Sequence, residues 1–295
     1  MITRREMLRT SLVLGGTTLF APRLFAAVPI PEDRKFTEQL GWKIGPQIYS
    51  FRMFPFAEAI KMVAACEVSS YEQYAGQRVS KSSDISVGPD LLKPENKDVL
   101  KQVKDLLTEN GCVMHAVGVC PADRSHFDFA AEFNIPVITS EPAFNKMDEV
   151  SKLTEEYKIN VGIHNHPQPS LYWNPETVLT QLKNASPRVG ACCDTGHWLR
   201  SGLNPLESVK KLKGHIVSFH IKDIKKNGDE YDTDCLFNQG DVGIADILKE
   251  FATHNVEGPI PFSIEYEAAW ENNLPQVAEC VRLFDATAMS IVASR

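Results

Sequence analysis

The sequence predicts an α/β protein folded as a (β/α)8 barrel, the TIM barrel. Short apolar runs alternate along the chain with amphipathic stretches that have helical spacing. From about residue 135 onward these units follow one another at similar intervals, which favours parallel strands joined by right-handed crossovers. Eight such units favour a closed barrel over an open sheet. An open doubly wound sheet is the alternative, but no GxGxxG motif follows the first expected strand.

The expected strands are eight short apolar runs. In chain order they are residues 43–51, 69–74, 112–119, 135–140, 160–166, 189–194, 216–223 and 260–267. Between them, apolar residues three and four positions apart predict helices, as in the stripe of Val99, Val103 and Leu106. Two long polar insertions, 76–97 and 225–243, are expected to be loops over the mouth of the barrel.

The first 27 residues have the layout of an export signal. The pair Arg4 and Arg5 precedes a short apolar stretch and then small residues, an order that resembles the twin-arginine signal. The stretch is too short to cross a bilayer, which takes about 20 helical residues. We therefore expect 1–27 to be a signal peptide and 28–295 to be the barrel, without a membrane span, in the periplasm or otherwise exported. A cytoplasmic chain with a basic start, or an uncleaved anchor, is the alternative.

Charge and cysteine content narrow the class of protein further. The chain has 31 Lys and Arg against 38 Asp and Glu, a formal net charge of −7, and no basic block. This balance argues against nucleic acid as the main partner. The chain has seven cysteines, an odd number, and no CxxC motif. Buried reduced thiols are therefore expected rather than a disulfide framework.

Polar residues end four consecutive expected strands, where an apolar run should continue. Residues two apart on a strand share a face, which pairs His164 with His166, Cys192 with Asp194, His220 with Lys222, and Glu265 with Glu267. In a parallel barrel these strand ends converge at one mouth. Imidazole and carboxylate ligands suit Mn²⁺, Co²⁺, Zn²⁺ or Mg²⁺. We predict one divalent metal ion at this point.

Three motifs resemble those of the xylose-isomerase-like TIM barrels, the sugar isomerase/epimerase superfamily that also contains endonuclease IV and inosose dehydratase. They are Asp-x-Gly-His at 194–197, His-x-Lys-Asp at 220–223, and Glu265 at the end of the last strand. In that family a Glu on strand five, an Asp on six, a His on seven and a Glu on eight hold the metal. The resemblance implies that the last three ligands here are Asp194, His220 and Glu265.

The chain departs from the family on strand five, where His164 stands in the place of the family's glutamate. The family's epimerases use the glutamates of strands five and eight to move a proton on opposite faces of a sugar carbon, and only Glu265 remains here. His164 could ligate the metal or act as the second acid and base. Glu141, at the end of strand four, could supply the missing carboxylate, and His166 is a further candidate ligand.

These residues predict a metal-dependent enzyme that moves a proton next to the carbonyl of a non-phosphorylated sugar or keto-sugar. Isomerisation or epimerisation is one outcome. Elimination by a 3-keto-glycoside lyase or dehydratase is the other, and an unequal pair of His and Glu favours it modestly. A non-catalytic sugar-binding barrel is a third interpretation. A phosphodiesterase of the endonuclease type is disfavoured by the acidic balance.

Each candidate residue has an expected role. The expected catalytic residues are Glu265, His164, His166 and Lys222. The expected substrate-binding residues are His197, Glu267, Tyr49 and Trp198. The candidate metal ligands are His164, Asp194, His220, Glu265 and Glu141. A small carbohydrate is the expected partner, and the sequence leaves open whether the chain forms a homo-oligomer.

Overall fold

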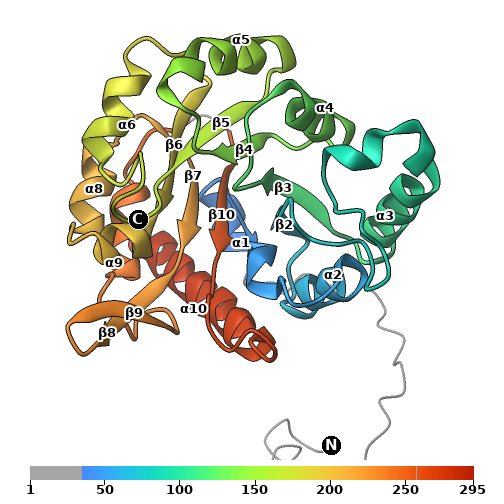
Figure 1. The fold of residues 1–295 in the computed structure, drawn as a ribbon. Coiled ribbons are helices and arrows are strands. Elements are labelled where there is room, and N and C mark those ends of the chain that lie inside the picture. Colours follow the sequence, from blue (N-terminus) through green and yellow to red (C-terminus); the bar gives the residue numbers. More distant parts are fainter. Residues whose placement is uncertain (1–34, 257) are drawn as a thin grey trace, which may run out of the picture.

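The computed structural model describes residues 35–256 and 258–295. The expected signal peptide, residues 1–27, lies outside this part of the chain. Eight parallel strands of the described chain form one sheet, which closes almost completely into a barrel (Figure 1). The predicted (β/α)8 fold is confirmed.

The barrel sheet has the strand order β1-β10-β7-β6-β5-β4-β3-β2. A parallel bridge between Gln47 and Glu72 joins its two ends. The barrel strands are β1 (Trp42–Pro46), β2 (Ser70–Gln73), β3 (Val113–Val117), β4 (Val137–Ser140), β5 (Asn160–His164), β6 (Val189–Asp194), β7 (Ile216–Ile221) and β10 (Ile260–Ile264). The antiparallel strands β8 (Asp223–Asn227) and β9 (Glu230–Cys235) form a separate hairpin.

Helices cover the outside of the barrel (Figure 1). They are α1 (Lys35–Gln39), α2 (Phe56–Ala65), α3 (Lys97–Glu109), α4 (Arg124–Glu132), α5 (Met147–Tyr157), α6 (Pro175–Leu182), α7 (Thr195–Arg200), α8 (Pro205–Lys211), α9 (Ile244–Phe251) and α10 (Leu274–Ala293). Short 3-10 turns are η2 (Ile48–Phe51), η3 (Pro89–Leu92), η4 (Pro94–Asn96) and η5 (Phe144–Lys146). The Asn174 side chain starts α6 by accepting a hydrogen bond from the backbone N–H of Glu176 at 2.9 Å.

Aromatic packing shows which strand residues face the helices. Phe219 of β7 and Phe262 of β10 stack with ring centroids 4.6 Å apart, and both contact Phe251 of α9. These rings therefore lie between the sheet and the outer helices. Because successive side chains of a strand alternate, the neighbouring His220 and Ser263 point into the barrel. The interior beneath the mouth is consequently polar at these positions.

Most barrel strands are shorter than predicted, mainly at their carboxyl ends. The strand predicted over 43–51 ends at Pro46, and η2 takes up the rest, so the second half of that prediction was wrong. The Gln47 side chain explains the change, because its Oε1 accepts a hydrogen bond from the backbone N–H of Tyr49 at 2.6 Å. That bond caps the 3-10 turn and replaces the next bond of the strand ladder.

The predicted loop over 225–243 contains the β8–β9 hairpin, which stands out from the barrel rim in Figure 1. For this reason β7 ends at Ile221, and the strand predicted to reach Asp223 was too long. The Asp223 carboxylate accepts hydrogen bonds from the backbone N–H groups of Gly240 at 3.1 Å and Val242 at 3.2 Å. These bonds close the base of the insertion beside the site.

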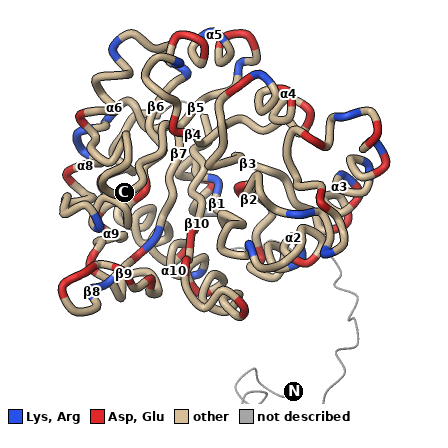
Figure 2. Tube along the Cα trace, viewed as in Figure 1, with Lys and Arg blue, Asp and Glu red and all other residues tan. Residues whose placement is uncertain are grey.

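The outer surface mixes charges of both signs, as Figure 2 shows along α3 and α5. Lys101 and Asp105 of α3, for example, form an ion pair of 2.6 Å. All seven cysteines are buried, as expected. None of the described helices combines the length and the apolar content needed to span a bilayer.

Candidate metal centre and substrate site

Four of the predicted ligand side chains meet at the carboxyl-terminal mouth of the barrel. His164, Asp194 and His220 end or nearly end β5, β6 and β7, and Glu265 follows β10 directly. All four are buried. One ligand atom from each of Asp194, His220 and Glu265 lies within 4.8 Å of the others, and the same holds for His164, Asp194 and His197.

His164 lies between two carboxylates. Its Nδ1 is 3.1 Å from Glu141 Oε1, and its Nε2 is 3.4 Å from Asp194 Oδ2. Because a carboxylate only accepts, the hydrogen bond to Glu141 places the imidazole proton on Nδ1. The lone pair of Nε2 then faces the centre of the site. Glu141 therefore lies behind the ring of His164.

Asp194 ends β6 and begins α7. Its Oδ1 accepts a hydrogen bond from the backbone N–H of His197 at 2.8 Å, which caps the helix. Its Oδ2 faces the site, 3.3 Å from Lys222 Nζ and 3.6 Å from His197 Nε2. Burial alone would raise the pKa of Asp194, but the neighbouring His197 and Lys222 hold that pKa well below its usual value. The carboxylate is therefore ionised.

His220 is held from behind by Glu72, a residue of β2 that the sequence analysis did not single out. His220 Nε2 is 2.9 Å from Glu72 Oε2, and His220 Nδ1 is 3.3 Å from Glu265 Oε2. Burial would lower the pKa of His220, but the negative Glu72 raises it well above its usual value. A divalent ion at Nδ1 would take the place of a proton. An acidic residue inside the expected strand 69–74 was the signal that could have revealed Glu72.

Lys222 is fully buried among acidic side chains. Its Nζ lies 3.0 Å from Glu265 Oε2 and 3.3 Å from Asp194 Oδ2, and it also contacts Glu267 Oε1 closely. Burial would lower the pKa of Lys222, but the carboxylates raise it well above its usual value. The pKa of Glu265 is lowered, chiefly by Lys222 against the effect of burial. Any metal ion bound by Asp194 and Glu265 would share these oxygens with the ammonium group.

His197 faces the site from α7 and has a guanidinium behind it. Arg200 Nη1 lies 3.1 Å from His197 Nδ1, and Arg200 Nη2 is 2.8 Å from Asp234 Oδ1 of β9. Burial, helped by Lys222 and opposed by Asp194, lowers the pKa of His197 well below its usual value. The sequence analysis did not find Arg200, because its contacts come from the hairpin insertion.

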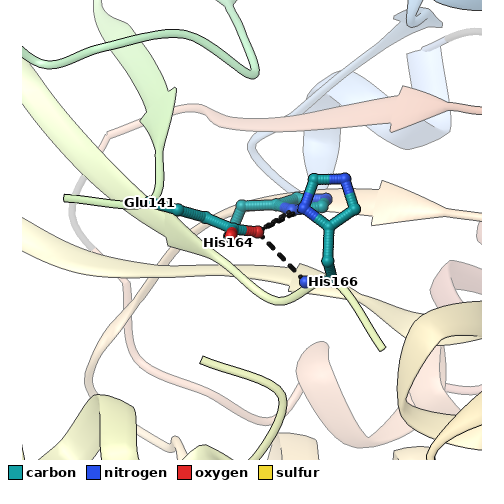
Figure 3. Close-up of side chains that lie close together, drawn as sticks. All are labelled: Glu141, His164 and His166. Atoms are coloured by element: carbon teal, nitrogen blue, oxygen red, sulfur yellow. Dashed lines mark hydrogen bonds and ion pairs between the residues drawn. The ribbon is translucent and has the colours of Figure 1, made fainter. Parts of the chain in front are cut away.

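Glu141 also binds His166 at the exposed edge of the site. Figure 3 shows the Glu141 carboxylate beside the rings of His164 and His166. Its Oε1 accepts from the backbone N–H of His166 at 3.1 Å and lies close to His166 Nδ1. The hydrogen bond between the His166 side chain and Glu141 raises the pKa of His166. Burial would raise the pKa of Glu141, but hydrogen bonds from both histidines lower it to about 2.

The remaining predicted substrate residues lie in different settings. Tyr49 of η2 is partly exposed, and its ring lies 5.8 Å from that of Trp270, over which Arg52 stacks at 3.3 Å. Burial raises the pKa of Tyr49. Trp198 of α7 is buried, with 1% of its surface exposed. The structure therefore brings Tyr49, but not the surface of Trp198, to the solvent at the mouth.

Three buried ligand atoms at this centre make no well-directed hydrogen bond within the described chain. They are His164 Nε2, Asp194 Oδ2 and His220 Nδ1. Such atoms are normally satisfied in folded proteins, by a protein group, water or an ion. The two candidate ligand groups share Asp194, and between them they offer imidazole nitrogens and carboxylates, a mixture that fits a divalent transition metal.

A cavity of about 560 Å³ adjoins the site at the ends of β3 and β4. Its lining includes Glu141, which connects it to the two histidines of β5. Much of the remaining wall is apolar, from Val119, Pro121, Ala143 and Val150. The cavity has room for a substituent of a ligand held at the metal centre.

Fold and site define a (β/α)8 barrel with a buried, polar centre at its carboxyl-terminal mouth. Residues 138–284 match the family model described as xylose isomerase-like TIM barrel. The matched segment runs from β4 into α10 and includes His164, Asp194, His220 and Glu265. Comparison with curated proteins gives no match.

Solved structures share the fold over most of their length. An uncharacterised protein from Parabacteroides distasonis is 25% identical, with a TM-score of 0.62, and the match covers 83% of this chain and 98% of that one. A xylose isomerase-like TIM barrel protein from Mycobacterium smegmatis, in complex with magnesium, is 12% identical with a TM-score of 0.67, covering 85% and 98%. A sugar phosphate isomerase/epimerase from Parabacteroides distasonis is 15% identical with a TM-score of 0.61, covering 83% and 96%.

Proposed function

We propose that the chain is a divalent-metal-dependent enzyme of the sugar isomerase/epimerase class, which moves a proton next to the carbonyl of a non-phosphorylated sugar or keto-sugar. The observation that carries the proposal is the set of buried ligand atoms on His164, Asp194 and His220 that make no well-directed hydrogen bond, grouped beside Glu265. A buried polar atom that is left without any partner costs about 1–3 kcal/mol, and the nearby ions Lys222 and Glu265 reduce that cost only for Asp194 and His220. When bound, a metal ion would supply Lewis-acid polarisation of the sugar's carbonyl and hydroxyl oxygens.

The ligand set favours a transition metal over Mg²⁺. Mg²⁺ prefers oxygen ligands, whereas Zn²⁺, Co²⁺ and Mn²⁺ accept imidazole more readily. His164 supplies a second nitrogen at the position where the family that this chain resembles has a carboxylate. The proposed site therefore has two nitrogen ligands and two acidic ligands. The Glu141 carboxylate behind His164 supports its role as a ligand through Nε2.

Two groups on opposite sides of the site are suited to move protons. Glu265, beside β10, is kept ionised by Lys222 and can accept a proton. His166, after β5, has a raised pKa because of its bond to Glu141 and can donate one. Strands β7 and β6 separate these two groups in the sheet. A substrate between them would meet a base on one side and an acid on the other.

The substrate itself would be held by the polar groups around Lys222. His197 and Glu267 lie close to the Lys222 ammonium and can bond sugar hydroxyls. A non-phosphorylated sugar fits the further proposal that residues 1–27 direct export, since phosphorylated sugars are mainly cytoplasmic. The exported location stays a prediction from the sequence.

Elimination is the second candidate reaction, and two observations favour it. The acid and the base are unlike groups, and the cavity beside Glu141 offers room for a leaving group. Glu265 would take the proton from the carbon next to the ketone, and the bond to the oxygen on the following carbon would break. The departing oxygen would receive its proton from His166. A 3-keto-glycoside would thus lose its aglycone and gain a carbon–carbon double bond.

The test offers a 3-keto-glucoside and a free ketohexose to metal-loaded protein in deuterated water. Epimerisation predicts deuterium at C3 and a new diastereomer from the ketohexose. Elimination predicts release of the aglycone from the glucoside and little change in the ketohexose. If neither substrate exchanges a proton or reacts, the proposed chemistry is wrong, and a sugar-binding barrel becomes the better interpretation.

A matched variant separates proton transfer from metal binding. His166→Gln removes the proposed acid but none of the four proposed ligands. We expect turnover to fall about 100-fold, with metal content unchanged. Equal losses of metal and activity would contradict the role of His166.

A further inference from the structure

Three buried histidines surround the centre, and each ring has a charged side chain behind it. A carboxylate stands behind His164 and behind His220, whereas a guanidinium stands behind His197. The sign of the charge decides which hydrogen bond the group can make with an imidazole nitrogen. A carboxylate only accepts a hydrogen bond, and a guanidinium only donates one.

Glu72 determines which nitrogen of His220 keeps its proton when the other nitrogen binds a metal. Because Glu72 Oε2 accepts from His220 Nε2 at 2.9 Å, that nitrogen is the donor. Ser263 Oγ also donates to Glu72 Oε2, at 2.5 Å, and His115 Nε2 lies 3.1 Å from the same hydroxyl. All these groups are buried, so the carboxylate is held in place from β2 across the interior. His220 is left to present Nδ1 to the site.

Arg200 has the opposite effect on His197. Its Nη1 donates to His197 Nδ1 at 3.1 Å, so the proton of the neutral ring is on Nε2. A competing donor exists, because Lys222 Nζ lies 3.5 Å from His197 Nε2. Arg200 is the nearer donor, and it is anchored by Asp234 at 2.8 Å and by the carbonyl oxygen of Tyr231 at 3.3 Å. His197 is left to present an N–H to the site.

We propose that the charged residue behind each ring decides what that ring presents to the site. Glu72 is a positioning residue that makes His220 a metal ligand through Nδ1. Arg200 is a positioning residue that keeps His197 out of the metal's ligand set and makes it a hydrogen-bond donor to a substrate oxygen. The inference rests on the proposed function, since it takes the metal centre as given.

Distance alone does not make this distinction. The Nε2 atoms of both His164 and His197 lie within 3.6 Å of Asp194 Oδ2, and all three residues form one candidate ligand group. The hydrogen bond behind each ring distinguishes the two. The hairpin insertion therefore affects the chemistry of the site through Asp234 and Arg200, although it contributes no proposed ligand.

The part of the proposal that concerns Arg200, the Arg200 half, is tested with the variants Arg200→Met and Arg200→Lys. Nitrogen-15 NMR of labelled histidine reads which ring nitrogen is protonated, with His197→Gln used to assign the signals. The wild type and Arg200→Lys should show His197 protonated on Nε2 only, because both side chains are pure donors. Arg200→Met should move the proton to Nδ1 and raise KM about tenfold, without weaker metal binding. Unchanged ring protonation in Arg200→Met would overturn this half.

The part of the proposal that concerns Glu72, the Glu72 half, is tested by titrating two variants, Glu72→Gln and Ser263→Ala, with metal ions and comparing their affinities. Glu72→Gln keeps the size of the side chain but removes the charge behind His220, and we expect Zn²⁺ and Mn²⁺ to bind about 10–100-fold more weakly. Ser263→Ala removes the other hydrogen bond to Glu72 but leaves the negative charge behind His220, so it should weaken binding less than Glu72→Gln does. Equal affinities for Glu72→Gln and wild type would overturn this half.

Failure of the metal centre and failure of the Arg200 contact give different results. A wild-type chain that binds no divalent ion would contradict the proposed function, and the Glu72 half would fail with it. The NMR measurement on the metal-free protein would still show whether Arg200 determines which nitrogen of His197 is protonated.

Discussion

His164 Nε2 lies 3.4 Å from Asp194 Oδ2, and neither atom has a well-directed hydrogen bond within the described chain. Lys222 Nζ, 3.3 Å from Asp194 Oδ2, compensates that oxygen in part, whereas a buried imidazole nitrogen that makes no hydrogen bond, such as His164 Nε2, is costly. His220 Nδ1 and Glu265 Oε2 complete the arrangement from the next two strands of the sheet. The proposed metal ion is the group that would satisfy all four.

The identity of the strand-five ligand should set metal preference. His164→Glu replaces a nitrogen ligand with an oxygen ligand and adds a negative charge. We expect the ratio of Zn²⁺ to Mg²⁺ affinity to fall at least about tenfold, because Mg²⁺ prefers oxygen. Competitive metal titration measures the ratio. His166→Gln, two residues away, should leave it unchanged, and an equal shift in both variants would speak against His164 as a ligand.

Removing the buried ammonium should strengthen metal binding. Lys222 Nζ contacts both Asp194 and Glu265, so it repels a divalent ion at the same oxygens. Lys222→Met should bind Mn²⁺ at least about tenfold more tightly, which corresponds to about 1.4 kcal/mol, while turnover falls. Lys225→Met, an exposed lysine on β8, is the control. Weaker binding in Lys222→Met would show that the lysine supports the metal site rather than competing with it.

His115 should make the fold sensitive to acid. Burial lowers its pKa from 6.5 to about 4, so between these values the unfolded chain takes up a proton that the folded chain does not. The free energy of unfolding is therefore highest above pH 6.5 and decreases as the pH falls, by about 3 kcal/mol from this group alone. Urea unfolding of wild type and His115→Gln at pH 7.5 and 4.5 measures the effect. The variant should lose less stability, and equal losses would contradict the assignment.

Export should depend on the arginine pair. Replacing Arg4 and Arg5 by lysine should retain the protein in the cytoplasm, because the twin-arginine resemblance makes the pair essential. Cell fractionation and immunoblotting follow the location. Lys35→Arg, beyond the signal, is a conservative control. Unchanged export of the double variant would mean that another signal, or none, operates.

The barrel and the set of strand-end residues were predictable from the sequence, because period-two alternation and a repeated strand–helix unit are local patterns. Strand ends were less predictable. Gln47 caps a 3-10 turn with its own side chain, and alternation carries no information about such a bond.

The hydrogen bonds behind the histidines could not be read from the sequence. Glu72 reaches His220 from β2 on the other side of the barrel, and Arg200 depends on a hairpin that was expected to be an irregular loop. The choice between His164 and Glu141 also depended on side-chain direction. Both residues end neighbouring strands, and only their geometry indicates which one lies behind the other.

The most direct test of the account is the metal content of the purified chain. After removal of bound ions and loading with Mn²⁺, Co²⁺ or Zn²⁺, elemental analysis should find close to one ion per chain. Asp194→Asn and His220→Asn should each hold far less, while circular dichroism shows that both remain folded. A folded wild-type chain without a stoichiometric ion, or variants that retain it fully, would contradict the proposed metal centre.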